Sequence, residues 1–196
     1  MTESLQTRVL ILCASPRKNG NSTTLAKQLA QGVEHAGGDP HTFFLHEMQI
    51  APCNACNACI KHPEGGCVIQ DDMQSLYPEL AAAQAVVFAS PVYWFNYAAQ
   101  LKLFIDRTYA VQDHDDYALT GKKIGIILTY ADVDEFHAGG VNALRSLQDM
   151  CRFVRAEIAG IVHGSADKPG DIQSRPELIK QAYDLGQKLV IGSKPD

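Results

Sequence analysis

Four of the six cysteines of this 196-residue chain gather in one short segment. They form a Cys-x2-Cys-x2-Cys-x7-Cys run made of Cys53, Cys56, Cys59 and Cys67. Four thiolates so close together are costly unless a metal binds them, and successive spacings of three are typical of a loop that wraps one iron–sulfur cubane. Gly65 and Gly66 give the backbone freedom to turn the last sulfur inwards. Zinc, which more often uses two separated Cys-x2-Cys pairs, and unbound thiols or a labile disulfide remain as alternatives.

A second group of residues indicates a phosphate site. An apolar segment at residues 9–13 runs into a polar loop, and helical spacing begins at Leu25. Strand, loop and helix N-terminus in succession bring free backbone N–H groups and the positive end of the helix dipole together. The side chains that can add hydrogen-bond donors or positive charge are Ser15, Arg17, Lys18, Asn21, Ser22, Thr23 and Thr24. The alternative is a capped helix with two solvated cations.

Spacing excludes other kinds of phosphate loop. No Gly-x4-Gly-Lys-Ser/Thr string occurs in the chain, so a Walker-type nucleotide loop is absent. The dinucleotide fingerprint needs three glycines, whereas this loop has only Gly20. The Cys-x5-Arg arrangement of small phosphatases fails because Asn19 stands where the arginine should follow Cys13. The loop therefore predicts a mononucleotide phosphate that is bound and not hydrolysed.

Two other segments have the chemistry of a wall for a flat ring. The first follows an apolar run at residues 85–89 and contains Pro91, Val92, Tyr93, Trp94 and Phe95. The second follows a run at residues 123–129 and contains Tyr130 and Asp132. Aromatic and apolar side chains stack on heterocycles, although they also pack on neighbouring helices or on another subunit. His137 is a lone loop histidine, and we assign no residue a role as catalytic acid or base.

The elements that position these loops alternate between strand and helix. Apolar runs predict strands at 9–13, 42–45, 85–89, 123–129 and 157–162, and helical spacing covers 25–36, 73–83, 98–110, 141–153 and 176–191. Central runs that are apolar on both faces indicate a parallel sheet with helices on each side, the doubly wound α/β class. The chain is long enough for one compact domain over residues 1–196. Ligands in this architecture lie beyond the carboxyl ends of the strands.

The composition of the chain limits the kinds of binding partner that we expect. A net charge of −5 with no basic cluster excludes a nucleic-acid surface. No apolar run reaches membrane-spanning length and no signal peptide is visible, so we expect a cytoplasmic protein without a membrane partner. Cysteines in that compartment are thiols or metal ligands more often than disulfides. Cys13 and Cys151 lie in apolar contexts and are expected to be buried.

Taken together, these motifs resemble the flavodoxin-fold NAD(P)H-dependent FMN reductases and, within them, the iron–sulfur flavoproteins. The shared residues are Ser15 to Thr23, Asp71-Asp72-Met73, Ser90 to Trp94, Lys102 and Asp106-Arg107. The resemblance implies a five-stranded parallel sheet of order 2-1-3-4-5 with a cysteine-rich insertion at about 47–70. It also implies FMN, with its phosphate on the first loop and its ring against Pro91 to Phe95 and the loop after Tyr130. In the iron–sulfur branch a similar cysteine run binds a [4Fe–4S] cluster.

The resemblance also implies an activity. Electrons would pass from NAD(P)H or a ferredoxin-like protein to FMN, and onward through the cluster or in pairs to a small acceptor such as a quinone. A homodimer or homotetramer is implied as well. Two alternatives stay open: a cluster-free reductase of quinones, nitro or azo compounds, and a flavin electron carrier or redox sensor. The modest net charge favours an enzyme over a carrier.

Overall fold

The core of the protein is one parallel sheet. The computed structural model describes residues 6–113 and 116–191. The sheet is made of β1 (Arg8–Cys13), β2 (Asp39–Phe44), β3 (Ala85–Tyr93), β7 (Lys123–Tyr130) and β8 (Glu157–Ser165). Their spatial order is β2-β1-β3-β7-β8 and every pairing among them is parallel, which confirms the predicted flavodoxin-like topology.

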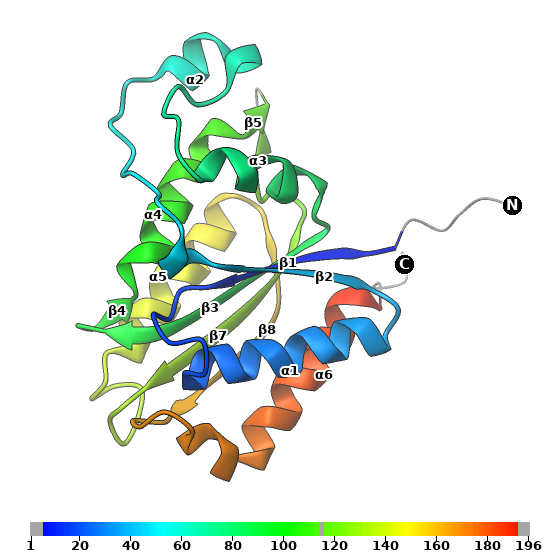
Figure 1. Cartoon of the computed structure of the whole chain (residues 1–196), viewed down its shortest axis with the longest axis vertical. Helices are drawn as coiled ribbons and strands as arrows, with labels where there is room; N and C mark the ends of the chain where they lie inside the picture. Colours follow the sequence, from blue (N-terminus) through cyan, green and yellow to red (C-terminus); the bar gives the residue numbers. More distant parts are fainter. Residues whose placement is uncertain (1–5, 114–115, 192–196) are drawn as a thin grey trace, which may run out of the picture.

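Helices cover both faces of the sheet (Figure 1). On one face lie α1 (Asn21–His35) and α6 (Pro176–Val190), and on the other lie α3 (Met73–Ala82), α4 (Ala99–Arg107) and α5 (Gly140–Phe153). Side chains alternate along β1, so Val9 and Ile11 enter the α1 and α6 side of the core while Leu10 and Leu12 enter the other side. This alternation explains why the central strands are apolar throughout.

Two glycines allow α1 and α6 to approach closely. A Cβ on Gly32 would lie 2.1 Å from the Tyr183 carbonyl oxygen, and a Cβ on Gly186 would lie 2.1 Å from the Leu29 carbonyl oxygen. Both contacts are with backbone, so a side chain cannot be accommodated by a rotamer change. The two helices are therefore held at a distance that only glycine permits.

Gly186→Ala is expected to destabilise the protein by about 1–3 kcal/mol, because the helices must separate to admit the methyl group. This loss outweighs the gain of about 1 kcal/mol in helix propensity. Gly65→Ala is the control, since its Cβ would meet nothing within 4 Å. Urea unfolding of both variants measures the difference, and equal stability of the two would contradict the close crossing.

Several element bounds differ from the expected ones. α1 begins at Asn21 and not at Leu25, because Gly20 is extended at φ −71° and ψ 163° and takes the N-cap position. β2 begins at Asp39 and Leu45 falls in a 3-10 turn, η1 (Leu45–Glu47). β3 continues to Tyr93 because it pairs with a short antiparallel strand, β4 (Asn96–Tyr97). The predicted helix at 98–110 ends at Arg107 and continues as the 3-10 turn η3 (Thr108–Ala110).

The cysteine segment lies outside the sheet. It contains α2 (Ala58–Lys61) and η2 (Pro63–Gly65), and in Figure 1 it extends beyond α3. A second small sheet pairs β5 (Gln112–Asp113) with β6 (Asp116–Tyr117), and η4 (Asp171–Ser174) precedes α6. None of the helices among residues 6–113 and 116–191 has the length and apolar character needed to cross a membrane.

Candidate functional site

A cavity of about 220 Å³ lies at the carboxyl ends of the strands. It brings together eight of the residues expected to hold a cofactor: Ser15, Arg17, Asn21, Ser22, Pro91, Val92, Tyr93 and Tyr130. These residues come from the loop after β1, the start of α1 and the ends of β3 and β7. The cavity is therefore where a doubly wound sheet places its ligand.

One end of the cavity is suited to a phosphate. The first turn of α1 reaches it with Ser22, and no side chain caps the N–H groups of that turn. Ser15 turns its Oγ into the loop and accepts a hydrogen bond from the Arg17 N–H at 3.1 Å. A Cβ on Gly20 would lie 2.8 Å from that Oγ and 3.1 Å from the Arg17 carbonyl oxygen, so a side chain there would displace the Ser15 hydroxyl. Helix N–H groups, two hydroxyls and the Arg17 guanidinium together fit a phosphate monoester.

Three neighbouring polar residues have other partners. Asn21 lines the cavity, yet its amide braces the loop after β8: Nδ2 donates to the carbonyls of Ala166 and Lys168, and Oδ1 accepts from the N–H groups of Gly170 and Ile172. Thr23 lies outside the cavity and its Oγ1 donates to the Arg17 carbonyl. Lys18 instead pairs with Glu47 at 2.7 Å. These side chains shape the loop and do not face the phosphate end.

The aromatic hairpin between β3 and β4 only partly faces the cavity. Trp94 and Phe95 form its two-residue turn with φ values of +46° and +65°, which leaves Trp94 94% exposed. Phe95 packs against the backbone of Gly139 in the loop after β7. Asp132 is exposed and accepts from the Val133 N–H. Trp94, Phe95 and Asp132 therefore do not line the cavity, contrary to expectation, because the turn directs the two aromatics outwards.

The far wall of the cavity contains residues that the sequence analysis missed. They are Thr129 and Ala131 at the end of β7 and Ala166, Asp167 and Pro169 after β8. The rule that ligands lie beyond strand ends could have identified the loop after the fifth strand. Its residues have no distinctive side-chain chemistry, so motif spacing alone gives no signal.

Tyr130 connects the cavity wall to two partly buried polar side chains. Its hydroxyl lies 3.1 Å from Nδ1 of His163 and 3.4 Å from Oε2 of Glu135. Burial, together with the negative charge of Glu135, raises the pKa of Tyr130 to about 12. Tyr130 is thus a neutral hydrogen-bonding phenol at neutral pH.

The four cysteines of the predicted metal run line a second cavity, of about 250 Å³. Left-handed backbone at Ala55 and Asn57, with φ of +55° and +59°, turns the chain tightly between the first cysteines. Asn54 accepts from the Cys56 N–H and supports this turn. Cys13 and Cys151 are buried elsewhere, as expected.

Arg107, at the end of α4, holds the two ends of the cysteine segment together. Its guanidinium is 1% exposed and donates to the Ala51 carbonyl at 2.9 Å and to Asp71 Oδ2 at 2.6 Å. A second nitrogen donates to Asp71 Oδ1 at 3.1 Å. Burial raises the pKa of Asp71, but the bonds from Arg107 and from the N–H groups of Ala51 and Met73 outweigh it and leave that pKa below its usual range.

The same network reaches Cys67. Burial alone would raise the pKa of this thiol, but hydrogen bonds from the Ile69 N–H, the Tyr77 hydroxyl and Arg107 lower it. The pKa of Cys59 is raised by burial and by the other cysteines beside it. The surroundings of these two thiols therefore differ: hydrogen-bond donors lower the pKa of Cys67, whereas burial and neighbouring thiols raise that of Cys59.

The donor set of this cavity fits an iron–sulfur cluster in chemistry, since thiolates are the usual ligands and a buried cation lies beside them. Across the part of the chain that the structure describes, no three histidine, cysteine or acidic side chains lie close enough to hold a single metal ion.

The fold and the first cavity define a flavodoxin-like protein with a mononucleotide pocket. The model of the NADPH-dependent FMN reductase family matches residues 7–166, so the chain belongs to that family of FMN-dependent oxidoreductases. An iron–sulfur flavoprotein of Archaeoglobus fulgidus is 31% identical over 180 residues, which are 91% of this chain and 76% of that protein. The predicted family is confirmed.

Other relatives agree with this assignment. An iron–sulfur flavoprotein of Methanosarcina thermophila is 35% identical over 111 residues, and the chain spans 56% of its length. The solved NAD(P)H:quinone oxidoreductase from Methanothermobacter marburgensis is similar with a TM-score of 0.72 and 19% identity, over 94% of this chain and 97% of that one. At that identity the likeness concerns the fold.

Proposed function

We propose that the protein is an iron–sulfur flavoprotein. NAD(P)H or a ferredoxin-like donor reduces FMN, and the electrons leave through a [4Fe–4S] cluster to an acceptor. The observation that carries the proposal is that all four cysteines of the run line one cavity while a separate phosphate-type pocket lies at the strand ends. Bound FMN would supply hydride chemistry, and the cluster would supply one-electron transfer.

The chain's own residues would bind and orient these groups. Ser15, Ser22 and Arg17 would hold the FMN phosphate, and Pro91 to Tyr93 with Tyr130 would flank the ring. Cys53, Cys56, Cys59 and Cys67 would hold the cluster. No side chain is needed as a general acid or base, because the cofactors carry out the chemistry.

Partners and location belong to the same proposal. The acceptor is a small molecule or a ferredoxin-like protein in the cytoplasm, without nucleic acid or membrane. A homodimer or homotetramer is supported by exposed aromatic side chains at one rim of the sheet, Trp94, Phe95 and Phe136 among them. Such a cluster is typical of a subunit contact.

Anaerobic purification of the wild type and two cysteine variants tests the proposal. The wild type is expected to contain FMN together with iron and acid-labile sulfide in equal amounts. Cys67→Ser is expected to lose iron and sulfide and to keep FMN, because it removes a ligand distant from the flavin pocket. Cys151→Ala, buried in α5, is the control and is expected to keep all three.

Two other outcomes would overturn parts of the proposal. FMN without iron or sulfide after anaerobic reconstitution favours the cluster-free reductase of quinones, nitro or azo compounds. The absence of a closely spaced ligand group among the described residues is the observation that keeps this second function open. Failure of NADH and NADPH alike to reduce the flavin would favour an electron carrier or sensor.

A further inference from the structure

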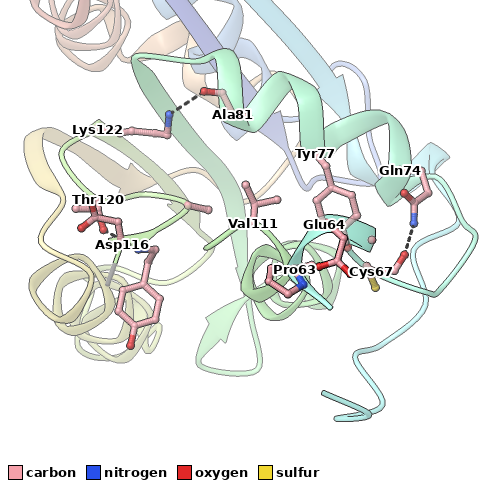
Figure 2. A pocket seen from close by; sticks show the side chains of 15 residues that line it. Pro63, Glu64, Cys67, Gln74, Tyr77, Ala81, Val111, Asp116, Thr120 and Lys122 are labelled. Atoms are coloured by element: carbon pink, nitrogen blue, oxygen red, sulfur yellow. Dashed lines mark hydrogen bonds between the residues drawn. The ribbon is translucent and has the colours of Figure 1, made fainter. Parts of the chain in front are cut away.

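A cavity of about 600 Å³ shares no lining residue with the FMN-type pocket. It is a groove between α3, the loop that ends the cysteine segment, and the chain that leads from η3 to β7. Figure 2 shows Cys67 and Tyr77 at one end of this groove, Asp116 and Thr120 at the other, and Val111 between them.

The groove shares one wall with the cysteine cavity. Cys67 and Ala110 line both cavities, so these two residues belong to the shared wall. Gln74 fixes the backbone of this wall, because its Nε2 donates to the carbonyls of Cys67 at 3.0 Å and of Ile69 at 2.7 Å. A molecule in the groove would lie directly beside a group bound by Cys67.

The charged side chains of the groove already have partners. Lys122 Nζ donates to the carbonyls of Ala81 and Ala83, and Asp116 accepts from Arg155 at 2.7 Å. Glu64 pairs with His62 at 3.7 Å. The two acids thus have basic neighbours, whereas Lys122 contacts only neutral carbonyls and forms no ion pair with an acidic side chain among the described residues. A cationic ligand would be repelled by this ammonium, and an oxygen acceptor suits it.

The remaining surface suits a flat molecule that carries oxygen acceptors. The ring of Tyr77 and the side chain of Val111 offer an apolar surface, with small alanines on both sides at positions 81, 110 and 118. An ammonium has three donors and Lys122 uses two, so one N–H remains for a carbonyl oxygen. A quinone has this combination of a flat ring and carbonyl acceptors.

We propose that this groove is the binding site of a neutral quinone-class electron acceptor, which would receive electrons through Cys67; this rests on the function proposed above. In the overall reaction, NAD(P)H, one proton and the quinone are converted to NAD(P)⁺ and the hydroquinone. The hydride provides two electrons and one proton, and water provides the second proton. The acceptor is thereby reduced at the cysteine segment and not on the flavin.

Ala81→Trp tests the site, with Ala82→Trp as the matched control. Both alanines are exposed on α3, but only Ala81 lines the groove. Menadione is the probe, and its binding to the anaerobically purified, oxidised holoprotein is measured by equilibrium dialysis. Ala81→Trp is expected to weaken binding about tenfold or more, a loss of about 1.4 kcal/mol, while Ala82→Trp binds as the wild type does.

A second variant closes the groove from the opposite wall. Gly65 faces open space, so Gly65→Trp should fold and should weaken menadione binding to a similar extent. In turnover assays the Ala81→Trp variant is expected to raise KM for menadione at least fivefold without slowing flavin reduction by NAD(P)H.

Failure of the site and failure of the proposed function give different results. Unchanged menadione binding in both groove variants, with iron and FMN present, overturns the quinone site alone. Competition between menadione and NAD(P)H in every variant would place the acceptor on the flavin and would also overturn the proposed quinone site. Loss of iron from the wild type overturns the proposed function, whereas the dialysis result still reports on the groove.

Discussion

Arg107→Met is expected to lower the free energy of unfolding by about 3–5 kcal/mol, the usual cost of removing one partner from a buried ion pair. The substitution leaves the Asp71 carboxylate without its cation at a site where the side chain is only 10% exposed. It also frees the Ala51 and Ile69 carbonyls, which Arg107 binds at the two ends of the cysteine segment. Chemical denaturation at neutral pH measures the loss.

The pair Lys102–Asp106 provides the control. It lies on the same helix with both side chains roughly half exposed, so Lys102→Met is expected to cost no more than about 1 kcal/mol. Adding Asp71→Asn to Arg107→Met should recover part of the stability, because the double variant buries no unpaired charge. If the double variant is less stable than Arg107→Met alone, the unpaired charge of Asp71 is not the source of the lost stability.

The dependence on pH gives an independent check. In the wild type the pKa of Asp71 is lowered, so its contribution to stability is full above the ordinary Asp pKa and is lost as the pH falls through the lowered value. Without Arg107, only the N–H groups of Ala51 and Met73 oppose the effect of burial, so the folded-state pKa of Asp71 is expected to be higher than in the wild type. The variant therefore has less stability to lose than the wild type as acid protonates Asp71, and its deficit relative to the wild type is expected to narrow at low pH.

The class of the sheet and the position of the FMN-type pocket follow from local patterns, whereas the strand order was implied by the family resemblance. Central runs that are apolar on both faces, and a polar loop before a helix, are properties of adjacent residues, and they predicted the parallel sheet and the pocket. The role of Arg107 was not predicted. Its pairing with Asp71 across 36 positions depends on burial that no local pattern reveals.

Asn21 and Trp94 show the same limit. Asn21 has the right type and position for a phosphate donor, but partners 145 to 151 residues away occupy its amide. The turn at Trp94 and Phe95 uses positive φ at two residues where Asn-Gly is preferred. Such a turn is stable because surrounding structure fixes it, as Gly139 does for Phe95, and it therefore cannot be read from propensity.

Ser22→Asp is expected to weaken FMN binding by about 3 kcal/mol, or about 100-fold, because it replaces a donor by a like charge at the phosphate end. Thr24→Asp is the matched control. It adds the same charge to the same helical turn, but Thr24 does not line the cavity and its Oγ1 donates to the Gly20 carbonyl. An acidic residue in the first turn also suits the helix dipole, so this control should fold normally.

Riboflavin distinguishes the contribution of the phosphate to binding from that of the ring, because it has the same ring system without the phosphate. Quenching of flavin fluorescence measures both affinities. If Ser22 faces the phosphate, Ser22→Asp reduces FMN affinity to about that of riboflavin and leaves riboflavin binding unchanged. Equal losses for both flavins would mean that the charge disturbs the ring wall formed by Pro91 and Tyr130, and the phosphate would then have to lie away from the first turn of α1. The strand-end cavity would remain a flavin site in that case, but with the opposite orientation.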